Sequence, residues 1–68
     1  MRMIPVSSSN LSSVGYENGV LWVSFKRGEL YEYTGVPEYV YRELMEADSH
    51  GEYFHRNIRT TYPYRRIR

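Results

Sequence analysis

The last sixteen residues of this 68-residue chain interleave arginine with tyrosine and contain no acidic residue. Guanidinium groups bind phosphate oxygens through paired hydrogen bonds, and tyrosine rings stack on nucleobases. The combination predicts a site for single-stranded RNA, for a loop of structured RNA, or for a nucleotide with several phosphates. The residues expected to contact such a ligand are Arg56, Arg59, Tyr62, Tyr64, Arg65 and Arg66.

The charge of the chain is divided between two blocks. Residues 1–52 carry four basic and eight acidic residues, a net charge of −4, whereas residues 53–68 carry five arginines and no acid, a net charge of +5. The formal total of +1 hides this asymmetry, which points to a negatively charged partner for the second block. The alternative is that these arginines pair with acids of the first helix in the same molecule, and composition leaves both interpretations open.

The sequence offers no constellation typical of catalysis, so we do not expect an enzyme. The absence of Cys excludes a thiol nucleophile and every Cys-ligated zinc site. His50 and His55 are five residues apart, which differs from the i,i+4 spacing of a zinc-binding helix, and no third ligand accompanies them. Because a glycine-rich phosphate loop is also missing, we expect neither a metal nor a cofactor.

The elements that must position these residues belong to one domain, residues 1–68, because this length allows no more. The N-terminal residues lack the apolar region of a signal peptide, and no apolar run approaches the length of a membrane span. We therefore expect a small cytoplasmic domain without a membrane partner.

The first hairpin is predicted by Asn18-Gly19, which suits the two positive-φ positions of a type I′ turn between alternating flanks. A two-residue loop fixes the register of the two strands. The expected pairs on one face are Tyr16 with Leu21, Val14 with Val23, and Ser12 with Phe25.

A second hairpin closes at Lys26-Arg27-Gly28, and two registers are possible. A two-residue loop would place Glu32 on the apolar face, which is costly for an unpaired carboxylate. A three-residue loop with Gly28 in the left-handed region instead places Tyr31 and Tyr33 on that face. We therefore predict the second register, in which Glu32 and Leu30 point outward beside Trp22.

Two helices and a tail follow the hairpins. Pro37 opens the first helix, whose apolar stripe is Val36, Val40, Leu44 and Ala47. Ser49 and Glu52 form a capping box for a second helix, which buries Phe54 and Ile58 and is stopped by Pro63. The predicted fold is α+β: a three-stranded antiparallel meander followed by two short helices and an extended C-terminal tail.

Aromatic and apolar residues outside the basic segment have two expected roles. Tyr16, Tyr31, Tyr33 and Tyr53 are assigned to the core or its rim, because tyrosine fills a small core at low entropy cost. The outward face of the meander carries Val20, Trp22 and Leu30, an apolar patch that would suit a protein partner or a homo-oligomer. An interaction or inhibitor module, such as a phage-type oligomeric trap for nucleotide signals, is the alternative function.

Five runs of the sequence resemble the KTSC domain family. They are SSNLSSVGY (8–16), LWVSF (21–25), Tyr31-Glu32-Tyr33, GVPEYVYRELMEADSHGEYF (35–54) and IRTTYPYRRI (58–67). The family comprises small free-standing bacterial and phage proteins and a segment at the C-terminus of some lysyl-tRNA synthetases. The resemblance implies RNA binding and supplies no catalytic residue. His50 departs from the family pattern, which often has Lys before the glycine that is Gly51 here.

Overall fold

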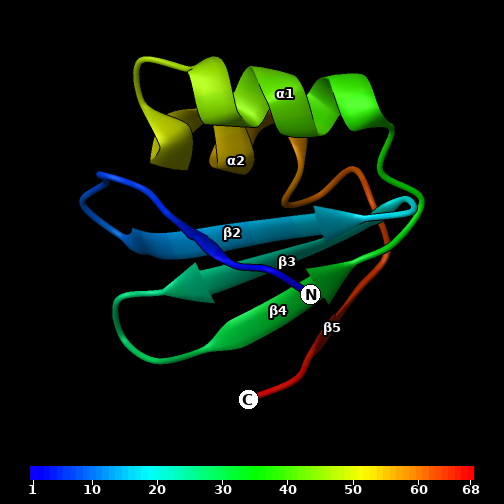
Figure 1. The fold of residues 1–68 in the computed structure, drawn as a ribbon, viewed down its shortest axis with the longest axis horizontal. Coiled ribbons are helices and arrows are strands. Elements are labelled where there is room, and N and C mark those ends of the chain that lie inside the picture. The colour runs from blue at the N-terminus through cyan, green and yellow to red at the C-terminus, as the bar shows by residue number, and fades with distance from the viewer.

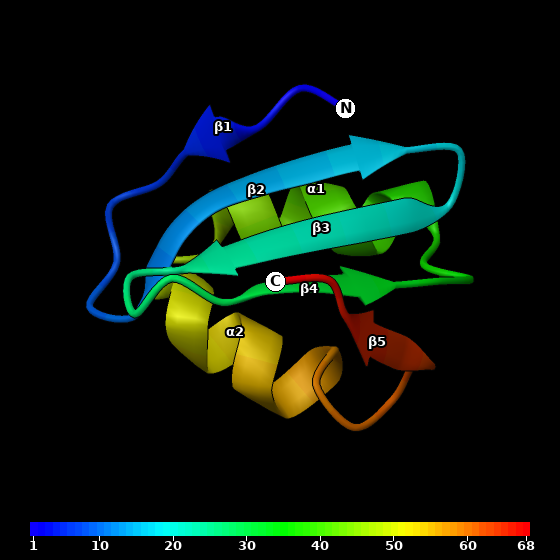
Figure 2. The same ribbon diagram turned by 90° about the horizontal axis from the view of Figure 1, so that it is seen from below.

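The alternating segments of the sequence form strands, and the computed structural model, which describes residues 1–68, arranges them in one antiparallel sheet (Figure 1). The sheet has five strands in the order β1-β2-β3-β4-β5, and two helices cover one of its faces, the inner face (Figures 1 and 2). The elements are β1 (Ile4–Pro5), β2 (Leu11–Glu17), β3 (Val20–Phe25), β4 (Leu30–Tyr33), α1 (Glu38–Glu46), α2 (His50–Asn57) and β5 (Tyr64–Arg66). The α+β class is confirmed.

The sheet is wider than the predicted meander, because a short strand is added at each edge. β1 pairs with β2, and β5, which lies in the segment predicted as an extended tail, pairs with β4. The N–H of Leu30 donates to the carbonyl of Arg68 at 3.0 Å, and the N–H of Ile67 donates to the carbonyl of Leu30 at 2.7 Å. The prediction of three strands and a separate tail is therefore wrong. β1 and β5 thus pair part of the backbone that a three-stranded sheet would leave open at its edges.

The first hairpin has the predicted turn, with φ of 52° at Asn18 and 82° at Gly19. The pairs of Tyr16 with Leu21 and of Val14 with Val23 are confirmed. The third pair is wrong, because a bulge between Leu11 and Ser13 places Leu11, not Ser12, opposite Phe25. In a regular strand Ser12 would face the core and Leu11 would face outward. The bulge reverses this arrangement, so that Leu11 is buried and Ser12 is exposed to solvent.

The second hairpin follows the predicted register. Tyr31 lies opposite Val23 and Tyr33 opposite Leu21, while Glu32 lies opposite Trp22 on the outer face. Gly28 has a φ of 106°, which a residue with a side chain rarely adopts. All four tyrosines assigned to the core or its rim are confirmed there. Tyr33 is buried, and the other three are half-buried against the core.

The helices begin at the predicted signals. Pro37 precedes α1, and Ser49 Oγ accepts a hydrogen bond of 3.1 Å from the N–H of Glu52 at the start of α2. The Tyr16 hydroxyl donates to the carbonyl of Val36 at 2.6 Å and its ring stacks on Tyr41, with centroids 4.9 Å apart. These contacts tie α1 to β2.

The second helix ends at Asn57, six residues before Pro63, so its predicted C-terminus is wrong. The N–H groups of Ile58 and Arg59 both donate to the carbonyl of Phe54 at 3.0 Å, and the chain then turns. Two β-branched threonines, which are poor helix formers, follow this point. Arg56 therefore lies on the helix and Arg59 beyond it, and the two do not share a helical face.

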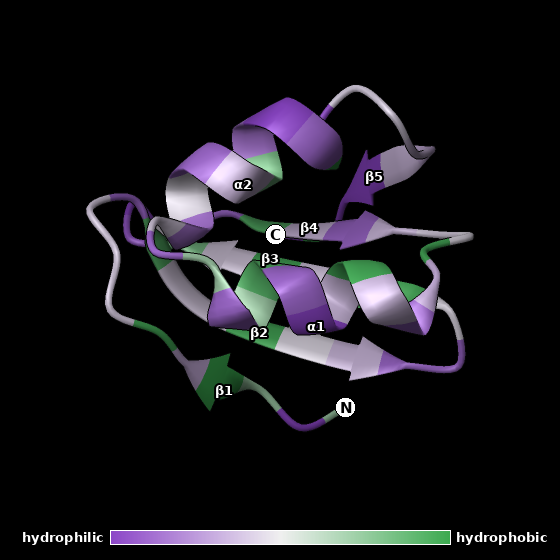
Figure 3. Cartoon of the chain, turned by 90° about the horizontal axis from the view of Figure 1, so that it is seen from above, coloured by the Kyte–Doolittle hydropathy of each residue, from purple (hydrophilic) through white to green (hydrophobic).

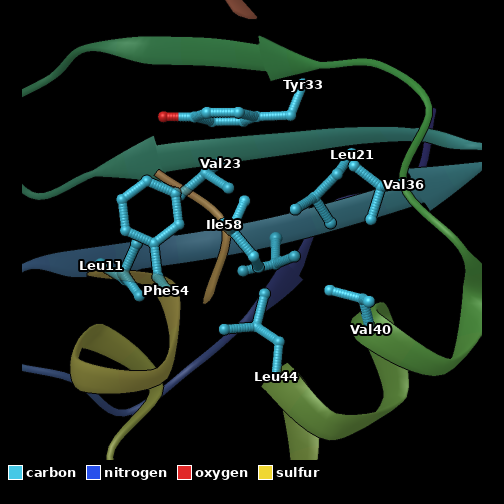
Figure 4. Close-up of a cluster of buried hydrophobic side chains, with 10 residues drawn as sticks. Leu11, Leu21, Val23, Tyr33, Val36, Val40, Leu44, Phe54 and Ile58 are labelled. Atoms are coloured by element: carbon cyan, nitrogen blue, oxygen red, sulfur yellow. The ribbon is translucent and has the colours of Figure 1, made fainter. Parts of the chain in front are cut away.

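One hydrophobic core fills the space between the inner face and both helices (Figure 4). Its members come from every element except β1 and β5, and from the segments that follow β4 and α2. They are Leu11, Val14, Leu21, Val23, Tyr33, Val36, Val40, Leu44, Phe54 and Ile58. Neither helix has the length and apolar character that a membrane crossing requires.

Candidate functional site

An open cavity of about 740 Å³ lies where the end of α2, the β3–β4 loop and the inner faces of β4 and β5 meet. Its volume falls in the range of about 300–1,000 Å³ that small-molecule sites occupy. Six aromatic side chains form much of its lining: Phe25, Tyr31, Tyr33, Phe54, Tyr62 and Tyr64.

The aromatic rings of the lining pack against one another, and one of them, Tyr64, is largely exposed to solvent. Tyr64 lies 5.8 Å from Tyr31 and 5.8 Å from Tyr33, between ring centroids, and its residue surface is 61% exposed. Burial raises the pKa of Tyr33 to about 12, with smaller contributions from Tyr31 and Tyr64, so its hydroxyl stays neutral at physiological pH. The Tyr33 ring is therefore uncharged, and the exposed Tyr64 ring is accessible for stacking.

Three cations border this wall without a carboxylate partner. Lys26, Arg27 and Arg59 line the cavity together with a single acidic residue, Glu29. The ion pairs of the protein are elsewhere and join Arg42 to Glu38, Arg56 to Glu52, and Arg65 to Glu32. The cavity thus has an excess of positive charge and favours an anionic ligand.

The structure brings together three of the six residues predicted to bind a ligand. Arg59, Tyr62 and Tyr64 line the cavity. Arg56 is held 3.5 Å from Glu52 along α2 and does not line it.

The remaining two predicted arginines lie on β5 outside the cavity lining. Arg65 lies opposite Glu32 on the outer face of the sheet. Arg66 lies opposite Tyr31, and its Nε donates to the carbonyl of Arg68 at 3.1 Å. Hydrophilic residues are frequent along β5 and α2 (Figure 3). Because Arg65 and Arg66 are neighbours on a strand, their side chains are distributed over two faces of the sheet.

Lys26 and Arg27 are cavity cations that were not among the predicted ligand contacts. In the sequence they mark a hairpin turn, and basic residues in turns are usually solvated. Their relevance arises only in the folded chain, where this turn and the residues that follow α2 line the same cavity although they are distant in sequence. The sequence indicates their position only through Phe25, an aromatic residue of the cavity lining that ends β3 and is followed by Lys26 and Arg27.

Glu32, Trp22 and Arg65 form a polar group on the outer face. Trp22 Nε1 donates to Glu32 Oε2 at 3.0 Å, and Arg65 Nε donates to Glu32 Oε1 at 2.7 Å. These hydrogen bonds lower the pKa of Glu32 below its ordinary value of 4.5, and the bond from Trp22 has the larger effect. These contacts connect β5 to β3 and β4. They also show that Arg65, one of the C-terminal arginines, pairs with a residue of β4 and not with the acidic residues of α1.

Glu32→Gln is expected to reduce the sensitivity of the fold to acid. Since the folded state lowers the pKa of Glu32, its contribution to stability is present above the unfolded pKa and is lost as pH falls through the lower folded value. Between about pH 5 and pH 3 the melting temperature of the parent protein should therefore fall more steeply than that of the variant. Thermal melts followed by circular dichroism measure this, with Glu38→Gln as the control for an exposed carboxylate. Parallel pH profiles for the parent protein and Glu32→Gln would contradict the assignment.

The predicted outer apolar patch is only partly present. Leu30 is 7% exposed, so the prediction that it is an exposed interface residue is wrong. The end of the chain pairs with its backbone and lies against this part of the sheet (Figure 2). Val20 and Trp22 are half-buried, and the indole N–H of Trp22 is already bonded to Glu32.

Metal-binding geometry is not found among the acidic and histidine side chains. No group of three or more His, Cys, Asp or Glu residues converges on one point. His50 Nδ1 lies 2.8 Å from the carbonyl of Leu44, a contact that orients its ring.

These features define a class of small α+β domains in which a five-stranded sheet and two helices border one aromatic, cationic cavity. The model of the KTSC domain family matches residues 7–62, and the chain belongs to that family. The predicted resemblance is confirmed.

The matches to two relatives and to one solved structure cover most of the chain. An uncharacterized protein of Stutzerimonas stutzeri is 41% identical over 70 residues, covering 98% of this chain and 99% of the relative. A lysine–tRNA ligase of Nostoc sp. is 40% identical over 47 residues, covering 69% of this chain and 8% of the ligase. The crystal structure of a KTSC domain protein from Yersinia pestis gives a TM-score of 0.92 at 37% identity, covering 98% of this chain and 97% of that one.

Proposed function

We propose that this domain is a non-catalytic module that binds RNA or a phosphate-bearing nucleotide in the cavity beside α2. The observation that carries the proposal is the presence of three cations without ion-pair partners beside an aromatic wall. A base supplies the flat ring and a phosphate supplies the negative charge that this combination requires. Both ligands share this chemistry.

The two halves of a nucleotide have separate places in the cavity. Tyr64 offers an exposed ring for stacking, with Tyr31 and Tyr33 behind it. Lys26 and Arg27 on the hairpin turn and Arg59 after α2 contact the phosphates. Arg59 belongs to the basic segment in which the sequence predicted phosphate binding, and the hairpin turn adds the other two contacts.

The RNA arm of the proposal has support from one relative. The 47-residue match lies within a protein named as a lysine–tRNA ligase, of which it is a small part. A segment carried by a protein that acts on tRNA is well placed to contact RNA. The protein-interaction alternative lacks comparable support, since Leu30 is buried and the indole N–H of Trp22 has a partner.

Titration of the protein with a fluorescent single-stranded RNA pentanucleotide and, separately, with ATP tests the proposal. Three phosphate contacts predict that the logarithm of the affinity falls with the logarithm of salt concentration with a slope of about −2. Tight RNA binding with weak ATP binding would assign the RNA arm, and the reverse would assign the nucleotide arm. Absence of binding to both, or an affinity independent of salt, would contradict the proposal.

A further inference from the structure

Glu29 is the one acidic residue in the cavity lining, and its carboxylate lacks a partner. Its Oε1 is the only buried side-chain nitrogen or oxygen in the protein without a hydrogen bond. The carboxylate also takes part in none of the three ion pairs, although Lys26 and Arg27 belong to the same loop. An acceptor of this kind is costly to bury without a hydrogen bond, so the carboxylate of Glu29 favours a ligand that brings a donor.

The loop that carries Glu29 is fixed by its backbone. The N–H of Phe25 donates to the carbonyl of Glu29 at 2.8 Å, and the N–H of Gly28 donates to the carbonyl of Phe25 at 2.9 Å. The N–H of Lys26 donates to the carbonyl of Asn10 at 2.9 Å, which ties the loop to the start of β2. The backbone of the loop is therefore fixed where two cationic residues and one acidic residue line one cavity.

We propose that Glu29 recognises guanine, by accepting hydrogen bonds from the ring N1–H and the 2-amino group; this rests on the proposed function. A carboxylate only accepts hydrogen bonds, and its two oxygens match two adjacent donors. Guanine is the base whose Watson–Crick edge presents two adjacent donors. Uracil presents one donor between two carbonyl oxygens, which repel a carboxylate, and adenine and cytosine each place a ring acceptor beside the amino group.

The geometry of the side chain is compatible with this role. Glu29 lines the cavity that contains the exposed Tyr64 ring, so a stacked base and the carboxylate share one space. The last torsion of a glutamate side chain is soft, so the two carboxylate oxygens can reorient toward a base bound in the cavity. Stacking holds any base, and the carboxylate then adds the discrimination.

The test compares ligands that differ by one donor. Affinities are measured for GTP, ITP and UTP, and for RNA pentanucleotides that carry guanine, hypoxanthine or uracil at the centre. Hypoxanthine lacks the 2-amino group and keeps N1–H. We expect the guanine ligand to bind about tenfold or more tightly than the hypoxanthine ligand, because a site built around a hydrogen bond to a charged group rejects the analogue that lacks the donor.

Glu29→Gln separates recognition from charge. Removal of a negative charge beside phosphates raises the affinity of every nucleotide alike, whereas loss of the guanine contacts removes the preference for guanine over hypoxanthine and uracil. Glu38→Gln, outside the cavity, is the matched control and should leave the preference intact. Equal affinity for the three bases in the parent protein would overturn the assignment of Glu29 and leave the proposed function standing. Absence of binding by all ligands would overturn both.

Discussion

Replacement of Lys26, Arg27 and Arg59 together by alanine is expected to lower the affinity for an RNA pentanucleotide or a nucleoside triphosphate by about 100-fold or more at low salt. Each of the three cations lines the cavity, and none has an ion-pair partner within the protein. The variant should also lose most of the salt dependence, since that dependence reports counterions released by phosphate contacts. Fluorescence anisotropy at several salt concentrations measures both quantities.

The matched control removes the same charge from outside the cavity. Replacement of Arg2, Arg42 and Arg56 by alanine also changes the net charge by three, but these residues do not line the site. Arg42 and Arg56 take part in exposed i,i+4 ion pairs, which contribute little to stability. The control should retain affinity within a few-fold of the parent protein. An equal loss in both triple variants would mean that net charge, and not the cavity, attracts the ligand.

Replacement of Phe54 by alanine is expected to destabilise the domain by about 3–5 kcal/mol. Phe54 is 4% exposed and packs edge-on against Tyr33 and Phe25, with ring centroids 5.4 Å and 5.5 Å away. Because a domain of this length has only about 3–10 kcal/mol of stability, the variant should be partly or wholly unfolded at 37 °C. Urea denaturation followed by the fluorescence of Trp22 measures the difference.

An exposed aromatic residue on the other helix provides the comparison. Tyr39 is 56% exposed on α1, and Tyr39→Ala should change the free energy of unfolding by only about 0.5 kcal/mol. Phe54→Leu retains most of the buried volume and should fall between these two variants. A loss of less than about 1 kcal/mol in Phe54→Ala would show that α2 is not held to the sheet mainly by this ring.

The central hairpins and the starts of the helices could be predicted because local rules determine them. Asn18-Gly19 selects a turn by its backbone conformation, and Ser49 selects a helix start by a hydrogen bond within four residues. β1 and β5 escaped prediction because they contain two and three residues, too few for a periodic pattern. Their pairing follows from open hydrogen-bonding groups at the edges of a sheet that exists only in the folded chain.

The sequence predicts the types of residue in the candidate site, aromatic and cationic, but only some of the residues that line it. Tyr62 and Tyr64 were found because composition alone marks the basic, tyrosine-rich segment. The separation of Arg65 from them depends on strand alternation in β5, which sends neighbouring side chains to opposite faces. The participation of Lys26 depends on the folded chain, in which the hairpin turn and the residues that follow α2 line one cavity.

The short strands at the two edges of the sheet also affect how copies of the domain behave at high concentration. An open strand edge can extend by pairing with the edge of another molecule. Here one edge ends in two residues, of which Pro5 has no N–H to donate, and the other presents the adjacent arginines Arg65 and Arg66. A second copy would meet a missing donor on one side and, on the other, Arg66, which takes part in no ion pair. The same short strands that extend the hydrogen bonding of the sheet thus disfavour pairing between the edges of two copies.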